Sequence, residues 1–118
     1  MKNDVYAQYQ WLEAEFVQLY ATFKFSSEIN LRLERMTQLM NLLGNPQTAY
    51  RSVHIGGTSG KGSTSTMVAQ MLQAAGYKVG LHTSPHVQVM NERHQVSGRM
   101  IPTTQLVKAW EVLKPAVE

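Results

Sequence analysis

The chain has 118 residues, enough for one domain with a core of its own. Its net charge of +3 comes from 11 basic and 8 acidic residues spread along the sequence, so no basic stripe indicates a nucleic-acid partner. The absence of cysteine excludes disulfides and thiolate metal sites, and with no signal peptide and no apolar run of about 20 residues we expect a cytoplasmic protein outside the membrane.

Two amphipathic helices are predicted in the first 50 residues, because apolar residues recur there at three- and four-residue steps. The apolar face of the first helix consists of Val5, Tyr9, Leu12, Phe16 and Leu19. That of the second consists of Leu33, Met36, Leu39, Met40 and Leu43. Gly44 and Pro46 should end the second helix, as a cap and a stop.

A strand, a helix and a second strand are predicted next. Ser52–Ile55 is partly β-branched and is followed by glycines, which favours a strand. The helix should begin near Gly60–Lys61 and end at Gly76. Its buried face is expected to be Met67, Val68, Met71, Leu72 and Ala75. With Tyr77–Leu81 as the second strand, the segment forms one βαβ unit whose strands are parallel.

A hairpin and a last helix are predicted near the C-terminus. His94–Val96 and Arg99–Ile101 should pair through a turn at Ser97-Gly98. Thr103 is expected to cap the last helix and Pro115 to stop it. The apolar face of that helix is Leu106, Val107, Trp110 and Leu113.

The junction between the first predicted strand and its helix predicts a phosphate-binding loop. The junction reads His54-Ile-Gly-Gly-Thr-Ser-Gly-Lys-Gly-Ser-Thr64. Its glycines allow backbone N–H groups to converge on an anion, and the helix N-terminus adds positive potential. Lys61 would contact the β- and γ-phosphates. The spacing departs from the general G-x-x-x-x-G-K-[ST] pattern, because Gly62 stands where the hydroxyl should be and the hydroxyls follow at Ser63 and Thr64.

Several segments together resemble the folylpolyglutamate and dihydrofolate synthases, within the Mur ligase-like family. The loop Gly57-Thr58-Ser59-Gly60-Lys61-Gly62-Ser63 resembles the family's G-T-N-G-K-G-S, and Thr83-Ser84-Pro85-His86 resembles its T-S-P-H. Ala74–Gly80 and Glu92-Arg93 agree with the family's residues at those places. Ile29-Asn30-Leu31-Arg32-Leu33-Glu34-Arg35 resembles I-D-L-G-L-E-R, which lies against the pterin substrate in that family. The resemblance runs from about Ile29 to Ile101.

This sequence departs from the family pattern at a few positions. Ser59 replaces an Asn in the loop, which works mainly through its backbone. Asn30 replaces an Asp and Arg32 a Gly, while His94-Gln95 replaces an apolar–basic pair. The last three departures concern the identity of the substrate more than the binding of nucleotide.

The resemblance implies a Rossmann-like, three-layer α/β P-loop domain that binds ATP, of the Mur ligase type. Residues 1–118 would be its N-terminal part, with 1–50 a helical lead-in, and the C-terminal glutamate-binding domain would be absent. The whole enzyme would use ATP and Mg²⁺ to activate a folate or dihydropteroate carboxylate as an acyl phosphate, which the amine of L-glutamate attacks. We expect that enzyme to be monomeric.

The resemblance also assigns roles to individual residues. ATP would be bound by Gly57, Thr58, Ser59, Gly60, Lys61, Gly62, Ser63 and Thr64. Lys61 would be catalytic, because it meets the negative charge on the transferring phosphoryl group. Ser84 would be a ligand of Mg²⁺ through its hydroxyl. The folate substrate would contact Ile29, Asn30, Leu31 and Arg32.

Some of these features have other interpretations. Without the resemblance, Ser84 is a turn serine. His82 and His86 are four residues apart, but Pro85 lies between them, so two polar loop histidines are favoured over a zinc pair. Glu92 and Arg93 form either an exposed ion pair or part of a substrate rim.

The function also has competing interpretations. ATP chemistry requires a carboxylate beyond Lys61 for Mg²⁺ or its water, and after Glu92 only Glu111 and Glu118 remain. We therefore expect the chain alone to be inactive. Another Mur-type amide ligase, a truncated nucleotide-binding module without catalysis, and a P-loop kinase are the alternatives. The shifted hydroxyl and the absent acid argue against the kinase.

Overall fold

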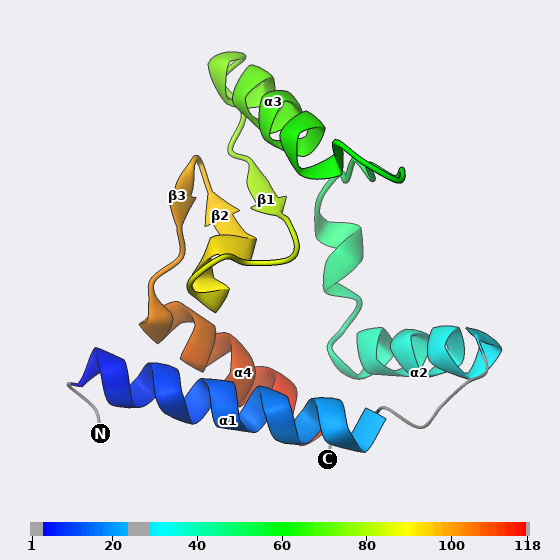
Figure 1. The fold of residues 1–118 in the computed structure, drawn as a ribbon. Helices are drawn as coiled ribbons and strands as arrows, with labels where there is room; N and C mark the ends of the chain where they lie inside the picture. The colour runs from blue at the N-terminus through cyan, green and yellow to red at the C-terminus, as the bar shows by residue number, and fades with distance from the viewer. Residues whose placement is uncertain (1–3, 24–28, 118) are drawn as a thin grey trace. The chain divides into compact units, whose positions relative to one another are not determined.

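The computed structural model describes residues 4–23 and 29–117, and the side chains of 4–19 and 33–117. The chain divides into two compact units, residues 1–51 with 107–118 and residues 52–106. The first contains the helices α1 (Val5–Phe23) and α2 (Ile29–Leu42), the 3₁₀ helix η1 (Pro46–Ala49) and most of α4 (Thr103–Val117). The second contains α3 (Lys61–Ala74), β1 (Gly80–His82), the 3₁₀ helix η2 (Met90–Arg93), β2 (His94–Val96) and β3 (Arg99–Met100). Figure 1 shows these elements.

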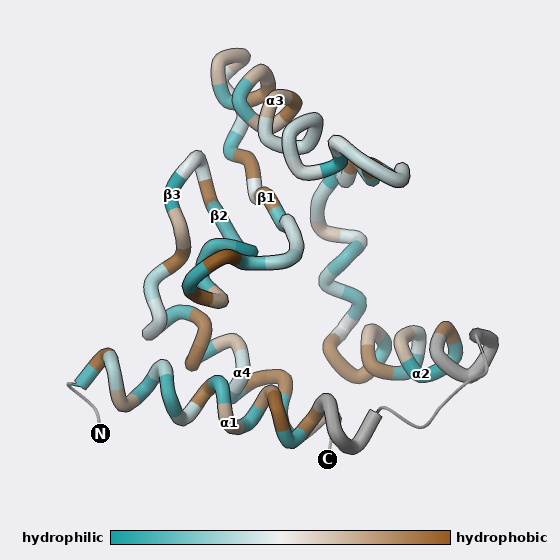
Figure 2. The backbone as a smooth tube through the Cα atoms, viewed as in Figure 1, coloured by the Kyte–Doolittle hydropathy of each residue, from teal (hydrophilic) through white to brown (hydrophobic). Residues whose placement is uncertain are grey.

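The core of the first unit lies where α1 packs against α4. Leu12 is fully buried, and Trp110 is 3% exposed. The ring of Trp110 lies 4.9 Å from that of Phe16, measured between centroids, and its indole N–H donates a 3.1 Å hydrogen bond to Glu15. The ammonium group of Lys114 lies 2.8 Å from the same carboxylate. Polar and apolar residues alternate along α1, as expected of a helix with one buried face (Figure 2).

The helices α2 and α3 end at the glycines that the sequence predicts. After α2, Gly44 and Asn45 both have positive φ, 74° and 56°, and Pro46 begins η1. After α3, Gly76 has φ 89°. The N–H groups of Gly76 and Tyr77 there donate to the carbonyls of Gln73 and Leu72, which is a Schellman motif. The predicted stops at Gly44 and Gly76 are therefore confirmed.

The sheet of the second unit is antiparallel, with strand order β1-β2-β3. Gly80 pairs with Val96, and Gln95 pairs with Met100. Ser97 and Gly98 have φ of 49° and 74°, and positive φ at both central residues is what a two-residue type I′ turn requires. The predicted hairpin is therefore confirmed, with β3 one residue shorter than expected.

The predicted parallel βαβ unit is wrong for the residues that the structure describes. Residues 52–55 form no strand, and their backbone groups make no backbone hydrogen bond to a described residue. The second predicted strand is shorter, Gly80–His82, and pairs antiparallel with β2. A segment becomes a strand only when a neighbour accepts and donates its ladder bonds, and no described residue makes such bonds with 52–55.

The predicted buried face of α3 is also wrong in part. Val68 and Leu72 are half-buried and Ala69 is buried, but Met67 and Met71 are 51% and 69% exposed and Ala75 is exposed too. The reason is that, among the described residues, α3 packs chiefly on β1.

The last helix differs from its prediction at both ends. Thr103 is its first helical residue rather than its cap, and the N–H groups of Gln105 and Leu106 donate to the carbonyl of Pro102. Pro115 lies inside the helix, which ends two residues later at Val117. A proline removes one helical hydrogen bond, and so close to the helix end few bonds depend on it. Leu106 and Trp110 are buried as predicted.

Candidate functional site

The N-terminus of α3 presents backbone donors to solvent. Gly60 precedes the helix in the left-handed conformation, with φ 72°, and no side chain caps it. The first ladder bond runs from the N–H of Thr64 to the carbonyl of Gly60, at 2.9 Å. The N–H groups of Lys61, Gly62 and Ser63 therefore have no acceptor within the helix. Such groups, together with the helix dipole, attract an anion.

The glycines of the loop leave open space beside the backbone. Gly57 has φ 147° and Gly60 has φ 72°, both of which disfavour any other residue. No atom lies within 4 Å of the place where a Cβ would stand on Gly56, Gly60 or Gly62. A phosphate group could therefore approach the main chain closely here.

Lys61 lies over the loop that precedes it. Its ammonium group donates a 2.7 Å hydrogen bond to the carbonyl oxygen of Gly57, so the cation is held against the main chain of the loop. The hydroxyl of Thr64 donates to the carbonyl of Gly60 at 2.9 Å, which leaves Ser63 as the exposed hydroxyl in the first turn of α3. The arrangement is what a triphosphate requires: backbone donors, a cation and a small hydroxyl.

The predicted Mg²⁺ ligand lies in the segment that follows β1. Ser84 is exposed and its bond to Pro85 is cis. Thr83 before it is tied to the sheet, since its N–H donates to the carbonyl of Arg93 at 3.1 Å. His86 accepts a 2.8 Å hydrogen bond at Nδ1 from Nε of Arg93. The hydroxyl of Ser84 is thus presented on a segment anchored at both sides.

Glu92 holds the next turn of this segment in place, a role that the sequence did not predict. Its carboxylate accepts hydrogen bonds from the N–H groups of Val87, Gln88 and Val89, at 2.8, 2.9 and 3.0 Å. The bond from Val87, then those from Val89 and Gln88, lower the pKa of Glu92 below its ordinary 4.5. The bond to Val89 is the Glu half of a capping box, whose signal in the sequence is an acidic residue three positions after the helix cap.

Of the two interpretations of Glu92 and Arg93, the exposed ion pair is wrong, and the substrate rim stays a prediction. The two side chains do not pair with each other: Glu92 binds backbone N–H groups, and Arg93 binds His86. Nearby, the buried Asn91 donates to the carbonyl of Ile101 at 2.8 Å. These bonds link the segment after β1 to the hairpin.

His82 and His86 do not form a pair. His82 ends β1 and faces His94 across the ladder, while His86 is bound to Arg93. Within the described part of the chain, no group of three His, Cys, Asp or Glu side chains could hold a metal ion.

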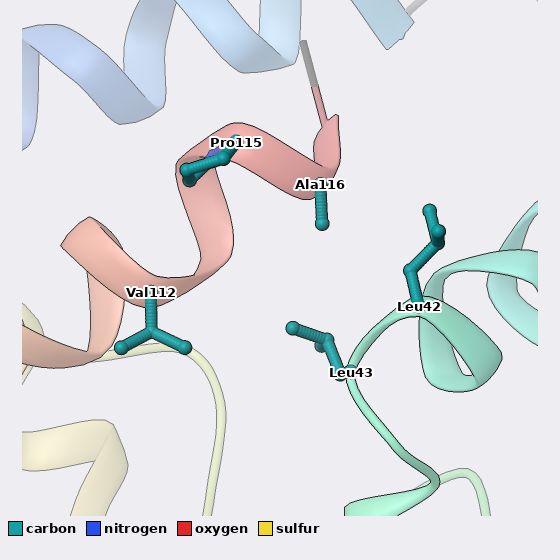
Figure 3. A pocket seen from close by; sticks show the side chains of 5 residues that line it. All are labelled: Leu42, Leu43, Val112, Pro115 and Ala116. Atoms are coloured by element: carbon teal, nitrogen blue, oxygen red, sulfur yellow. The ribbon is translucent and has the colours of Figure 1, made fainter.

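The predicted substrate residues lie in the first unit. Ile29, Asn30, Leu31 and Arg32 form the first turn of α2, and their side chains lie outside the described residues. The same unit holds an apolar hollow of about 440 Å³ lined by Leu42, Leu43, Val112, Pro115 and Ala116 (Figure 3). With no charged side chain in its lining, the hollow is unsuited to phosphate or glutamate. No described helix is long and apolar enough to span a bilayer.

The chain is similar in sequence to curated enzymes. It is 45% identical over 86 residues to a dihydrofolate synthase/folylpolyglutamate synthase of Bacillus subtilis, covering 73% of this chain and 20% of that protein. It is 42% identical over 84 residues to a folylpolyglutamate synthase of Lacticaseibacillus casei, covering 71% of this chain and 20% of that protein. The chain thus spans about a fifth of the length of these relatives. No family model matches it.

The fold is similar as well. The structure of a Mycobacterium tuberculosis folylpolyglutamate synthase complexed with ADP matches with a TM-score of 0.84 and 34% identity, over 96% of this chain and 24% of that one. The agreement extends over almost the whole chain, including the helices of the first unit.

Proposed function

We propose that this chain, which belongs to the folylpolyglutamate and dihydrofolate synthase family, forms the nucleotide-binding part of a ligase that uses ATP to join L-glutamate to a folate. The observation that carries the proposal is the start of α3, where Lys61 lies over a glycine loop beside three N–H groups without helical acceptors. A solved folylpolyglutamate synthase structure that matches 96% of this chain is complexed with ADP, which supports a nucleotide as the anion bound here.

In the proposed reaction the γ-phosphoryl group of ATP passes to the carboxylate of a folate or dihydropteroate, which gives an acyl phosphate and releases ADP. The amine of L-glutamate attacks the acyl carbonyl and loses a proton as the amide forms, and inorganic phosphate leaves. The loop residues Gly57–Thr64 bind the phosphates through their N–H groups, and Lys61 stabilises the charge on the phosphoryl group in transfer. The hydroxyl of Ser84 would hold Mg²⁺, whose chemistry is to neutralise the phosphate oxygens.

We also propose an architecture for the whole protein that contains this chain. Residues 52–55 have strand-forming side chains and lie directly before the loop, so in the whole protein they would form a strand of a parallel sheet in a three-layer, Rossmann-like domain. The exposed Met67 and Met71 of α3 would then pack on that sheet. We propose further that the whole enzyme is cytoplasmic and monomeric, with Ile29–Arg32 at the folate.

The alternative for the 118-residue chain is nucleotide binding without ligation. One observation favours it: the described residues contain no group of three metal-binding side chains. The metal would thus depend on oxygens from ATP, water and a single serine, and turnover needs more residues than these.

Two measurements on the purified 118-residue chain test the proposal. Isothermal titration with MgATP should give binding that Lys61→Ala weakens, and incorporation of labelled glutamate into tetrahydrofolate or dihydropteroate should be absent. Failure to bind ATP, ADP or AMPPCP would remove the nucleotide role. Incorporation of glutamate by the chain alone would contradict the view that further residues are needed, and would support the ligase itself.

A further inference from the structure

His82 and His94 face each other across two neighbouring strands. His82 is the last residue of β1 and His94 the first of β2, and the two are register partners in the antiparallel ladder. Their Nδ1 atoms lie 3.4 Å apart, and the ring centroids are 4.9 Å apart with the planes tilted by 42°. His82 is exposed and His94 is half-buried, so the pair is open to solvent on one side.

The separation of the two nitrogens suits a shared metal ion better than a hydrogen bond. Good hydrogen bonds from N–H have donor–acceptor distances of about 2.7–3.2 Å, and 3.4 Å exceeds that range. Two nitrogens bound to one ion at about 2.1 Å, at the tetrahedral angle, lie about 3.4 Å apart. The distance between the two Nδ1 atoms thus equals one edge of a zinc coordination tetrahedron.

Arg93, next to His94 in the chain, is bound elsewhere, because its Nε donates to Nδ1 of His86. The backbone holds the pair, since the register of β1 and β2 fixes the two Cα atoms and the N–H of Thr83 binds the carbonyl of Arg93 next to the pair.

We propose that His82 and His94 form a two-histidine site for a divalent transition-metal ion that prefers imidazole, with Zn²⁺ as its representative and water in the remaining positions. The site is distinct from the magnesium role proposed for Ser84, because Mg²⁺ takes oxygen ligands and imidazole suits Zn²⁺. It does not depend on the proposed ligase function. By joining β1 to β2, a bound ion stabilises the folded sheet through mass action.

The test is a titration of the full 118-residue chain, free of any histidine tag, with ZnCl₂ and without nucleotide or Mg²⁺. The chain has four histidines, so each can be replaced in turn. We expect one Zn²⁺ to bind per chain. Binding should change the NMR chemical shifts of the ring protons of His82 and His94 only. His82→Gln and His94→Gln should each raise the half-saturating Zn²⁺ concentration at least about tenfold, since each removes one of two ligands.

His54→Gln is the matched control, because His54 is exposed and lies outside the sheet. The half-saturating Zn²⁺ concentration of this variant should lie within about twofold of wild type. Zn²⁺ should raise its melting temperature as much as it raises that of wild type. The proposal is overturned if His82→Gln leaves binding unchanged, if His54→Gln weakens it equally, or if His86→Gln weakens it while His94→Gln does not. Should His94→Gln fail to fold by circular dichroism, the exposed His82→Gln alone decides the outcome.

Discussion

The ammonium group of Lys61 donates a 2.7 Å hydrogen bond to the carbonyl oxygen of Gly57, four residues earlier in the chain. Both groups are exposed. The bond is therefore weak in water, and a phosphate that replaces the carbonyl as its partner gains a charge-assisted contact. This weak bond holds the ammonium group of Lys61 at the loop and still allows it to move. Such freedom suits a group that contacts a phosphoryl group during its transfer.

Lys61→Ala should weaken the binding of ATP more than that of AMP. A hydrogen bond to a charged group contributes about 1.5–3 kcal/mol, so the Kd for ATP should rise roughly ten- to a hundredfold. AMP lacks the β- and γ-phosphates that Lys61 is proposed to contact, so its weaker binding should change little. Titration calorimetry of the wild-type and variant chains with both nucleotides measures the difference.

Lys108→Ala is the control for this prediction, because Lys108 is an exposed residue of α4 and the substitution changes the net charge equally. It should leave the Kd for ATP within about twofold, as expected for an exposed, screened charge that makes no proposed contact with the nucleotide. Equal losses in the two variants would mean that Lys61 acts only through the net charge of the chain.

Gly60 and Gly62 should respond in opposite ways to alanine. Gly60 has φ 72°, and an L residue pays about 1–2 kcal/mol in that conformation, so Gly60→Ala should loosen the start of α3. Gly62 lies inside α3 with open space beside it, so Gly62→Ala should stabilise the helix by about 0.5–1 kcal/mol. Native-state hydrogen exchange of the α3 amides measures both effects.

Gly62→Ala also separates the stability of α3 from the affinity for ATP. If the open space beside Gly62 receives a phosphate, the added methyl group of Gly62→Ala should lower ATP affinity although the helix becomes more stable. If the ATP affinity of Gly62→Ala is unchanged or higher while the helix is more stable, no ligand atom approaches this glycine.

Features set by local chemistry were predictable from the sequence. The helix ends at Gly44 and Gly76 and the turn at Ser97-Gly98 depend on residues that tolerate positive φ, and the structure has positive φ at each of these positions. The glycine loop before α3 was predictable for the same reason. The amphipathic pattern also identified α1 and the buried Trp110 of α4.

Features set by distant partners were not predictable from local patterns. Residues 52–55 carry strand-forming side chains, but no described segment pairs with them, and Met71 is apolar yet 69% exposed. The role of Glu92 depends on a tight turn that brings three N–H groups to one carboxylate. The pairing of His82 with His94 followed only once the register of β1 and β2 was known, because spacing along the chain pointed to His86 instead.

Ser84→Ala should raise the Mg²⁺ requirement of the whole ligase that contains this chain. The hydroxyl is exposed and is proposed to hold the metal, so its loss should increase the half-saturating Mg²⁺ concentration before it lowers the maximal rate. The melting temperature should not change, because an exposed hydroxyl contributes little to stability. A magnesium titration of the activity, next to thermal unfolding of both proteins, gives the two readouts.

Ser84→Thr is the matched variant, since it keeps the hydroxyl and adds one methyl group. Its Mg²⁺ requirement should lie between those of wild type and Ser84→Ala. A half-saturating concentration that is the same in all three proteins, with a lower melting temperature in Ser84→Ala, would assign Ser84 to the turn before Pro85 and not to the metal.

The carboxylate of Glu92 should remain ionised to a lower pH than an ordinary glutamate. Its bonds from the N–H groups of Val87, Val89 and Gln88 favour the charged form and lower its pKa below 4.5 in the folded chain. A pKa that is lower in the folded state contributes stability that is fully present above 4.5 and is lost as the pH falls through the folded value. The contribution of Glu92 to stability should therefore decrease on acidification below pH 4.5.

The amide proton shifts of Val87, Gln88 and Val89 report this titration directly, because each N–H donates to the carboxylate. In wild type the three shifts should move together with one midpoint below 4.5, and in Glu92→Gln that movement should disappear. Glu92→Gln should also lower the melting temperature at pH 7 and converge with wild type below the midpoint, since the protonated carboxyl then resembles the amide. Glu111→Gln, at an exposed position of α4, should change neither readout. A shared midpoint at or above 4.5 would contradict the proposed hold of Glu92 on the segment after β1.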